Sequence, residues 1–518
     1  MAVHVQVKKN TYYDSVTLMI ITKEVKNVPG VKEVLVGMAT DLNKELSGNL
    51  NLLTPEIEEL TNNDFYITVD AESEEAFNHA VEKVDELLNK KAEDQAGDYK
   101  PPTFDSAYKT MSDANLAVIS IPGEYAAAEA RKALEKDMHV MLFSDNVPLD
   151  QELELKKYAH DKGLLVMGPD CGTAILNGIP LCFANVVKDG DIGMVGASGT
   201  GIQEVSAIIG KLGSGITQAI GTGGRDLKTE IGGIMMLDGI RALQNDPKTK
   251  VIVVISKPPA KEVMEKVLGA LKESEKPAVV HFIGGDPEVA RSHGAYAGLT
   301  LEDTAYKAVA LSRGEEVKDV VDFTVDKAEL EKKAQEEVGK YAKGQKYLRG
   351  LYSGGTLAYE ALEIMLENGK DGYSNIPLKK EYKLQNSFQS KEHTVLDLGE
   401  DEFTVGKPHP MIDPSTRIDV ILKEAKDPEV AVILLDFVIG YGANPDIVGE
   451  ILPGILQGRE LAQKEGRHIT FVAFVCGTNE DPQNLKECEA RLRENGVIVL
   501  PSNAQAIRFS EKLISSIK

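Results

Sequence analysis

The chain has 518 residues, of which 42% are hydrophobic and 27% are charged, a composition typical of a folded, soluble protein with several domains. Acidic side chains exceed basic ones by 23. This excess argues against a surface for nucleic acid or an anionic membrane, because such surfaces need clustered Lys and Arg. A locally basic pocket for a small anion stays compatible with it.

The sequence contains neither a signal-peptide pattern at Met1–Val5 nor an uncharged stretch long enough to cross a bilayer. Its longest apolar run, residues 431–443, carries Asp436. The cysteines show no zinc-type CxxC spacing, so we predict no metal site and a reduced, cytoplasmic location. They are Cys171, Cys182, Cys476 and Cys488.

Residues 1–95 alternate short strand and helix patterns. The segment 73–88 is amphipathic, with Phe77, Val81 and Val84 among the apolar residues on one face. We therefore predict a small N-terminal α+β domain of the ferredoxin-like or ACT-like kind. Its expected strands are residues 3–7, 31–38 and 64–69, and its expected helices are residues 14–25 and 73–88.

The rest of the chain reads as alternating strands and helices, the pattern of parallel βαβ units. A polar stretch at Lys90–Thr103, broken by Gly97 and two prolines, predicts a first linker. The charged stretch Glu329–Gln345, which favours a helix, predicts a second linker between two α/β blocks. The expected domains are a Rossmann-type domain at 104–188 and flavodoxin-type domains at 189–328 and 346–518.

An internal repeat is the most informative feature of the sequence. The segments Ile192–Ile209 and Leu348–Met365 each carry a strand, a Gly-rich turn and the start of a helix. An offset of 156 residues aligns the two turns and places Glu204 on Glu360. Later strands recur in the same order, so two copies of one α/β unit are predicted.

Each Gly-rich turn is a candidate phosphate-binding site. Glycine permits close approach of the backbone, and the free N–H groups of a first helical turn attract an anion. The alternative is a tight strand-to-helix turn with Thr as a cap. Two equivalent turns that face each other favour the phosphate site, so we expect them to lie close together. The candidate residues are Ser198, Gly199, Thr200, Gly354, Gly355 and Thr356.

Other candidates for catalysis follow predicted strands, where ligands of parallel sheets gather. The Pro-rich segment 406–414 holds His409 and Asp413 on a restricted backbone. Arg225 could bind a carboxylate or phosphate with both arms of its guanidinium, and Lys257 also stands at a strand end. The alternatives are a structural loop and salt-bridged surface residues.

These motifs carry a family resemblance. Residues Gly168–Gly201 are similar to the α-subunit of succinyl-CoA synthetase, and residues 394–403 and 440–448 resemble the C-terminal domain of its β-subunit. The whole chain resembles the FdrA family. The resemblance implies an α/β fold of duplicated flavodoxin-like succinyl-CoA-synthetase-type domains. A truncated Rossmann-like CoA-binding-type domain and the small N-terminal α+β domain complete it.

The sequence also departs from succinyl-CoA synthetase. It has no segment patterned as an ATP-grasp module, and the Gly-rich loop of a CoA-binding domain is missing, so weak CoA binding is predicted. The phosphorylated histidine of that enzyme would correspond to His293, which lacks the small residue before it. His293 is therefore a candidate phospho-carrier, and an ordinary surface histidine is the alternative.

The FdrA resemblance implies a subunit of oxamate carbamoyltransferase in allantoin breakdown. That enzyme converts oxalurate and phosphate, its co-substrate, into oxamate and carbamoyl phosphate, together with companion subunits. The alternatives are acyl-CoA synthetase chemistry through a phospho-histidine and a non-catalytic regulator that binds CoA or a metabolite. Expected partners are the small anionic substrate, the companion subunits and further copies of the chain, but no nucleic acid and no membrane.

Overall fold

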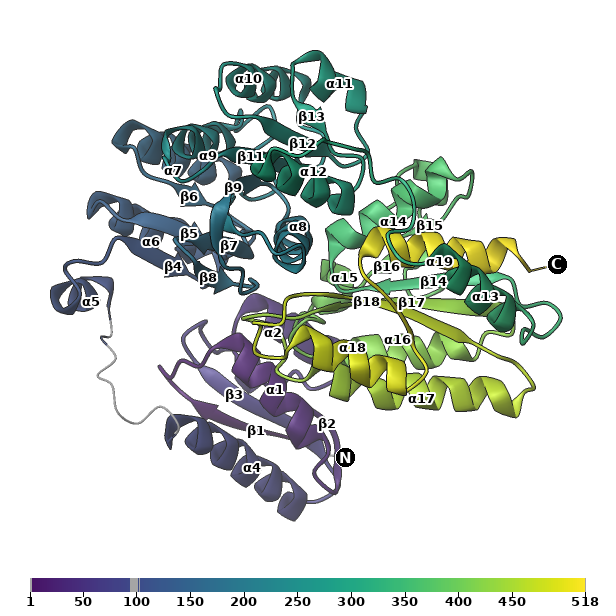
Figure 1. Cartoon of the computed structure of the whole chain (residues 1–518). Coiled ribbons are helices and arrows are strands. Elements are labelled where there is room, and N and C mark those ends of the chain that lie inside the picture. Colours follow the sequence, from purple (N-terminus) through teal and green to yellow (C-terminus); the bar gives the residue numbers. More distant parts are fainter. Residues whose placement is uncertain (1, 94–100, 102, 518) are drawn as a thin grey trace. The chain divides into compact units, whose positions relative to one another are not determined.

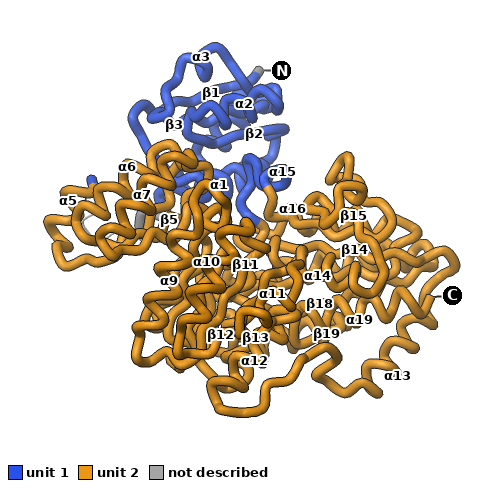
Figure 2. The backbone as a smooth tube through the Cα atoms, turned by 90° about the horizontal axis from the view of Figure 1, so that it is seen from above, with its two compact units in different colours: residues 1–103, 401–409 blue, residues 104–400, 410–518 orange. Residues whose placement is uncertain are grey.

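The structure is a computed structural model that describes residues 2–93, 101 and 103–517. The chain divides into two compact units (Figure 2), residues 1–103 with 401–409 and residues 104–400 with 410–518. Each unit is described by itself. The predicted first linker falls largely on residues 94–100 and 102, which lie outside the described residues.

The first unit contains an antiparallel sheet in the order β1-β3-β2 (Figure 1). Helices α1 and α4 cover one face of the sheet, and residues of α2 and α3 pack on the other. The predicted small N-terminal α+β domain is therefore confirmed. Its elements are β1 Ala2–Lys8, α1 Ser15–Lys26, β2 Val31–Met38, α2 Asp41–Asn49, α3 Pro55–Glu58, β3 Phe65–Ala71, α4 Glu74–Glu93 and α15 Asp401–Thr404.

The second unit begins with a short parallel sheet, in the order β4-β5-β6. Its small size agrees with a truncated Rossmann-like domain. The domain was predicted to extend to residue 188, whereas the hairpin β7–β8 pairs with the next sheet. The elements are α5 Phe104–Thr110, β4 Leu116–Ile119, α6 Gly123–Glu135, β5 His139–Leu142, α7 Leu149–Lys162 and β6 Val166–Met167.

A larger sheet follows, in the order β13-β12-β11-β9-β10-β7-β8. Strands β9 to β13 run parallel and only the β7–β8 hairpin is antiparallel. Residues of α8 and α12 pack on one face, and those of α9 and α10 on the other. The elements are β7 Thr173–Leu176, β8 Ile179–Cys182, β9 Asp189–Gly196, α8 Gly199–Lys211, β10 Ile216–Gly221, α9 Ile234–Asn245, β11 Val251–Ser256, α10 Lys261–Lys272, β12 Ala278–Phe282, α11 Pro287–Ser292, β13 Tyr296–Ala297 and α12 Leu301–Arg313.

The last sheet is parallel throughout, in the order β15-β16-β14-β17-β18-β19. Helices α14 and α19 lie on one face and α16 and α17 on the other (Figure 1). Both large sheets fit the predicted duplicated α/β architecture. The elements are α13 Lys327–Val338, β14 Tyr347–Tyr352, α14 Gly355–Glu367, β15 Tyr373–Ser374, η1 Lys380–Tyr382, β16 Thr394–Asp397, α16 Ser415–Ala425, β17 Val430–Val438, α17 Ile447–Lys464, β18 Thr470–Cys476, α18 Leu485–Glu494, β19 Ile498–Leu500 and α19 Asn503–Ser515.

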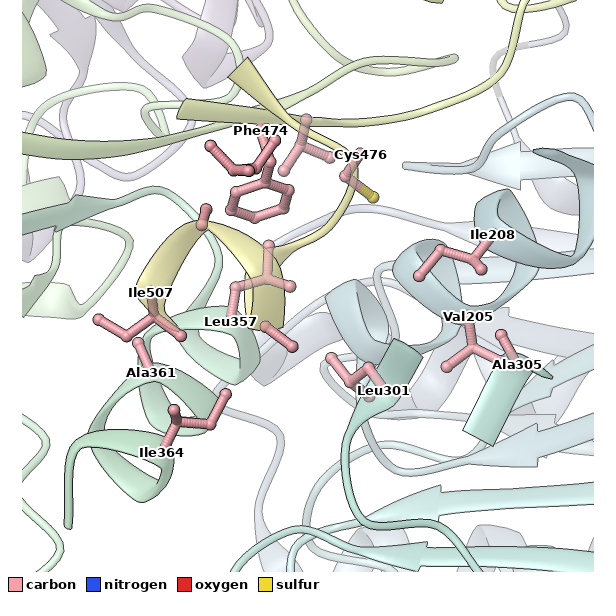
Figure 3. Packing of buried hydrophobic residues seen from close by; sticks show 14 of the residues in the cluster. Val205, Ile208, Leu301, Ala305, Leu357, Ala361, Ile364, Phe474, Cys476 and Ile507 are labelled. Carbon is pink, nitrogen blue, oxygen red and sulfur yellow. The ribbon is translucent and has the colours of Figure 1, made fainter. Parts of the chain in front are cut away.

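The two repeats share one hydrophobic core. Val205 on α8 and Leu301 on α12 belong to the same cluster as Leu357 on α14 and Ile507 on α19 (Figure 3). All four side chains are fully or almost fully buried. Burial on this scale holds the two repeats in one fixed relation, so that the starts of α8 and α14 belong to a single structural body.

The segment predicted as the second linker is a packed helix, α13. Its Ala334 is buried in the shared core, and Glu337 near its end accepts hydrogen bonds from His468 and Thr470. The helix that this charged stretch favours is therefore present, and it packs on the core through an apolar stripe. No helix among the described residues is long and apolar enough to cross a membrane.

Candidate functional site

The starts of α8 and α14 meet at the carboxyl ends of β9 and β14. Ser198 Oγ lies 2.7 Å from Thr356 Oγ1. A side chain at Gly354 would come within 2.9 Å of Thr200 Cγ2. The predicted proximity of the two Gly-Thr turns is therefore confirmed, and we refer to this place as the helix pair.

Different caps start the two helices. Ser198 is the N-cap of α8, and its Oγ accepts a hydrogen bond from Gly201 N–H at 3.2 Å. Gly354 holds the same place before α14 and has no side chain to cap with. In both turns the glycine and threonine at the helix start stay partly exposed. The helix pair is thus open to a ligand, since these N–H groups lie at the positive end of each helix dipole.

Asp436 on β17 supplies the missing cap in the second repeat. Its carboxylate accepts hydrogen bonds from Gly354 N–H at 3.0 Å and from both Ser353 N–H and Ser353 Oγ. Arg417 Nη2 lies 2.6 Å from Asp436 Oδ1, and both side chains are buried. These contacts fix the carboxylate in place, so Asp436 is a structural part of the turn.

Asp397 is a second carboxylate at the same turn, at the carboxyl end of β16. Its side chain is 5% exposed, and Oδ1 accepts a hydrogen bond from Gly399 N–H at 2.9 Å. A side chain at Gly355 would overlap Oδ2, so this oxygen lies against the first residue of α14. Burial raises the pKa of Asp397 to about 7, against the opposing effects of the Gly399 N–H and Lys257.

Lys257 extends from the carboxyl end of β11 toward the second repeat. Its Nζ lies 4.7 Å from the centre of the Tyr359 ring on α14, and the residue is exposed. The first repeat therefore places a cation over the first turns of the helix of the second repeat. The structure thus brings Lys257, one of the residues predicted as catalytic, to the helix pair.

Two glutamates behind the helix pair link the repeats reciprocally. Glu204 on α8 accepts a hydrogen bond from Asn503 N–H at 3.1 Å, at the start of α19. Glu360 on α14 accepts one from Leu301 N–H at 2.6 Å, at the start of α12. Each repeat thus caps the last helix of the other. Burial raises the pKa of both carboxyls, that of Glu360 to about 7.

Arg225, which was predicted to bind a substrate anion, forms an ion pair and a hydrogen bond with other residues of the protein. Its Nη2 lies 2.8 Å from Glu152 Oε2 and donates to the carbonyl of Val147 at 2.7 Å. The next residue, Asp226, lies 2.9 Å from Lys156 Nζ, and both are fully buried. This loop therefore joins α7 to the neighbouring sheet. The contacts of Arg225 agree with the alternative interpretation, in which it is a salt-bridged residue.

Two of the other predicted residues, His293 and Asp413, form hydrogen bonds within their own segments. His293 ends α11 and precedes β13, so the parallel register puts it toward the amino ends of the strands. Its Nδ1 lies 2.8 Å from the carbonyl of Val289. Asp413 accepts a hydrogen bond from Ser415 N–H at 2.9 Å, at the start of α16. His409 belongs to the first unit, where burial lowers its pKa to about 4.

Sequence reasoning missed both carboxylates of the second turn. Asp397 and Asp436 each stand near the end of a strand that is otherwise mostly apolar. Burying a charge there costs free energy unless the charge is paired or hydrogen-bonded. At the corresponding strand ends the first repeat has Gly221 on β10 and Ile255 on β11, neither of which is acidic. A residue-by-residue comparison of the repeats would have singled them out.

Three family models match parts of the chain. One described as "CoA-ligase" matches residues 351–513, one described as "CoA binding domain" matches residues 187–284, and one described as "AllF, heavy metal-associated domain" matches residues 1–102. The CoA-binding match covers the α8 turn and Lys257, in the segment for which the sequence predicted the first flavodoxin-type domain.

A relative from Escherichia coli (strain K12), "Uncharacterized protein YahF", is 45% identical over 517 residues, which are 99% of each chain. The chain belongs to the YahF family. Subunit alpha 2 of succinate–CoA ligase [ADP-forming] from Archaeoglobus fulgidus is 26% identical over 207 residues, 39% of this chain and 70% of that one. The family is thus related to succinyl-CoA synthetase.

Solved structures of two CoA-linked enzymes resemble the fold at greater distance. Acetyl-coenzyme A synthetase 1 (dinucleotide forming, apo form) of Ca. Korarchaeum cryptofilum has 16% identity and a TM-score of 0.32, with 78% of this chain and 85% of that chain covered. ATP citrate lyase of Methanothrix soehngenii has 19% identity and a TM-score of 0.36, with 45% of each chain covered.

These relationships correct two expectations from the sequence. The chain was expected to be a carbamoyltransferase, and this is wrong, because its domains and relatives are of the CoA-ligase type. Its CoA binding was expected to be weak, but the CoA-binding match supports involvement of CoA. The membership in the succinyl-CoA-synthetase-like group is confirmed, and the narrower FdrA assignment stays a prediction.

The heavy-metal description of the N-terminal model does not suit the residues present. Residues 1–102 contain no cysteine, the ligand that soft metal ions prefer. The described residues of the chain contain no group of three His, Cys, Asp or Glu side chains that could hold a metal ion.

Proposed function

We propose that the chain catalyses acyl transfer between phosphate and the thiol of CoA, as in the final step of acid–CoA ligases, and that it does so at the helix pair. The observation that carries this proposal is the 2.7 Å contact between Ser198 and Thr356, which joins two helix starts at one point. The CoA-ligase and CoA-binding matches support the reaction class.

Two helix N-termini suit a phosphate group. Each helix start carries the equivalent of roughly half a positive elementary charge, and the hydroxyls of Thr200 and Thr356 stand beside the N–H groups. The glycines matter because a side chain at Gly354 would crowd Thr200. Glycine therefore leaves the room that an anion needs, and the residues present fit the phosphate of an acyl phosphate.

Lys257 adds a mobile cation to this site. Lys257 is exposed, rests on Tyr359 and forms no ion pair with the residues that the structure describes, so it is available to an anion. A phosphate that leaves an acyl group gains negative charge, and fixed N–H groups with a nearby cation stabilise that charge best in the transition state. The expected roles are phosphate binding for Thr200 and Thr356 and charge neutralisation for Lys257.

CoA, when bound, supplies the thiol that accepts the acyl group. The CoA-binding match includes the α8 turn and the strand end that carries Lys257. These residues offer N–H donors and a cation to the phosphates of CoA as well as to the acyl phosphate. The chain's own part in the step is to orient the acyl carbon toward the thiol.

The test is thioester formation from CoA and a panel of acyl phosphates, including acetyl, propionyl and succinyl phosphate, with the purified full chain. We expect thioester formation with at least one member and loss of most of it in Thr200→Val and Thr356→Val. Thr110→Val, an exposed site on α5, is the matched control and should retain full activity. Absence of both turnover and phosphate binding would refute the proposal, whereas CoA binding without turnover would favour a non-catalytic role.

A further inference from the structure

Resting on the proposed function, we propose that Asp397 belongs to the anion site at the helix pair and binds the phosphate group as a neutral carboxyl, donating a hydrogen bond to it from Oδ2. The site then takes up a proton together with its anion. The ligands of this class are tetrahedral oxyanions, which include inorganic phosphate, sulfate and the phosphate of an acyl phosphate.

The position of Asp397 is the first argument. Its side chain is only 5% exposed, yet a side chain at Gly355, the first residue of α14, would overlap Oδ2. Oδ1 accepts a hydrogen bond from Gly399 N–H at 2.9 Å, which fixes the direction of the carboxyl group. Oδ2 accepts no hydrogen bond from the described residues. A buried and uncommitted oxygen therefore points at the helix start where the anion is expected.

Comparison with the other carboxyls near the site is the second argument. Asp436 uses its oxygens on Ser353, Gly354 and Arg417. Glu360 accepts a hydrogen bond from the N–H at the start of α12, behind the helix pair. Among the residues that the structure describes, Asp397 is thus the carboxyl that lies at the helix start with one oxygen left for a ligand.

The two forms of this carboxyl act in opposite ways on an anion. As a carboxylate, Asp397 offers only acceptor oxygens and repels a negative ligand, and burial strengthens this repulsion. As a neutral acid, it offers an O–H donor. A single proton therefore removes one opposing charge from the site and adds one hydrogen-bond donor to it.

The electrostatic surroundings of Asp397 are the third argument. Burial has the largest effect and raises its pKa to about 7. Lys257 favours the charged form, whereas Glu400 and Asp436 favour the neutral one. The neighbouring Tyr352 stays neutral, because burial raises its pKa far above the usual range. The charged and titratable groups on the surrounding elements are Lys257 at the end of β11, Tyr352 on β14, Glu400 after β16, Arg417 on α16 and Asp436 on β17.

An anion in the site favours the neutral form further, because a negative charge beside a carboxyl raises its pKa. In the proposed reaction the same hydrogen bond acts on the phosphate, whose negative charge grows as the acyl group leaves. The carboxyl thus helps the phosphate both to bind and to depart, and it stays protonated throughout.

Sulfate is the probe for the proton uptake, because its charge is constant between pH 6 and 8. With a pKa of about 7 in the free chain, binding by the neutral form alone makes the sulfate affinity fall about tenfold over this range. Calorimetric titration of the full chain at pH 7.5, in buffers of different ionisation enthalpy, should show that a proton is taken up with the anion.

Two substitutions separate the donor from the charge. In Asp397→Asn the amide can donate where the neutral carboxyl does. Its sulfate affinity should be nearly constant with pH, about tenfold tighter than that of the natural chain at pH 8, and without proton uptake. Asp397→Ala lacks both the charge and the donor, so its affinity should be constant too but roughly 10- to 150-fold weaker than that of Asp397→Asn. Asp397→Leu, which fills the volume, replaces the Ala variant if that variant does not fold.

Glu363→Gln and Glu360→Gln are the controls. Glu363 is a half-buried carboxyl further along α14, and burial also raises its pKa. Glu360 lies behind the helix pair, with a pKa of about 7. Both variants should take up the proton and lose affinity between pH 6 and 8 as the natural chain does.

The outcomes separate the two proposals. If the natural chain binds neither sulfate nor phosphate, the proposed function itself fails. If sulfate binds without proton uptake, if Asp397→Asn keeps the uptake, or if the uptake disappears in Glu360→Gln instead, the assignment of Asp397 is wrong and the helix pair stands. If Asp397→Ala binds sulfate as tightly as Asp397→Asn, the carboxyl donates no hydrogen bond to the anion, and this also overturns the assignment.

Discussion

The two repeats build the same strand, turn and helix, but they treat the helix start differently. In the first repeat Gly221 and Ile255 hold the neighbouring positions at the ends of the flanking strands. In the second repeat the same register positions are Asp397 and, one residue beyond the Leu351–Leu435 pair, Asp436. The two repeats thus share the same helix start, but the second repeat places two carboxylates beside it.

This difference explains how a symmetric scaffold can hold an asymmetric reaction. Among the described residues, no carboxylate accepts a hydrogen bond from the N–H groups at the start of α8, whereas Asp436 accepts one from Gly354 N–H and Asp397 lies against Gly355 at the start of α14. The two halves of the helix pair are therefore chemically different, because the strand ends that flank the α14 turn carry Asp397 and Asp436 where the first repeat has Gly221 and Ile255. The predictions below address the two halves separately.

The largest effect should come from the fixed carboxylate. Asp436→Ala leaves Arg417 buried without its partner and removes the cap of Gly354. Loss of one partner of a buried ion pair costs about 3–5 kcal/mol in stability. Urea unfolding should show this loss. Ile255→Val, at the corresponding position of the first repeat, should cost only about 0.5–1.5 kcal/mol, and equal costs would contradict the asymmetry.

Next in size should be the effect of the threonines on phosphate affinity. Thr200→Val and Thr356→Val each remove one hydroxyl donor from the helix pair. A hydrogen bond to a charged group is worth about 1.5–3 kcal/mol, or roughly 10- to 150-fold in affinity. Calorimetric titration with inorganic phosphate measures this. An effect in one variant alone would mean that the anion sits on one helix only.

A smaller effect concerns the reciprocal glutamates. Because burial raises the pKa of Glu360 to about 7, the folded chain holds a proton there that the unfolded chain loses above about pH 4.5. Its contribution to stability therefore falls between about pH 4.5 and 7, by at most about 1.4 kcal/mol per pH unit. Glu360→Gln should reduce this slope in urea unfolding. An unchanged slope would show that the carboxyl is ionised throughout.

The smallest effect is expected for His293. The ring is held at the end of α11 and lies toward the amino ends of the strands. His293→Ala should therefore change neither phosphate affinity nor thioester formation from an acyl phosphate, and stability should change by no more than about 0.5 kcal/mol. Loss of thioester formation in this variant would restore the phospho-histidine mechanism.

Much of the architecture could be predicted because it repeats a period. The strands Val31–Met38 and Tyr347–Tyr352 follow from apolar runs bounded by turn signals, and the shared offset of 156 residues announced the duplication. The stretch that forms α13 was predicted as a helix-favouring linker, but its packing on the core was not predicted, because its exposed face is densely charged and its buried stripe, which includes Ala334, is narrow.

The site was harder to predict because strand ends carry little pattern. The two Gly-Thr turns were predicted, since they recur and their glycines have a geometric reason. Arg225 was singled out for its charge, but its partner Glu152 is 73 residues away in the sequence and became visible only in the fold. Asp397 was not predicted as a site residue, because its contact with Gly355, which belongs to a different strand–helix unit, is visible only in the folded chain.

The central claim is that the two helix starts form one anion site. A titration of the natural chain with inorganic phosphate at pH 6.5, followed by calorimetry, tests it most directly through its stoichiometry. We predict one phosphate per chain, with affinity weakened in both Thr200→Val and Thr356→Val. Two independent phosphates per chain, each sensitive to one threonine only, or no binding at all, would contradict the account.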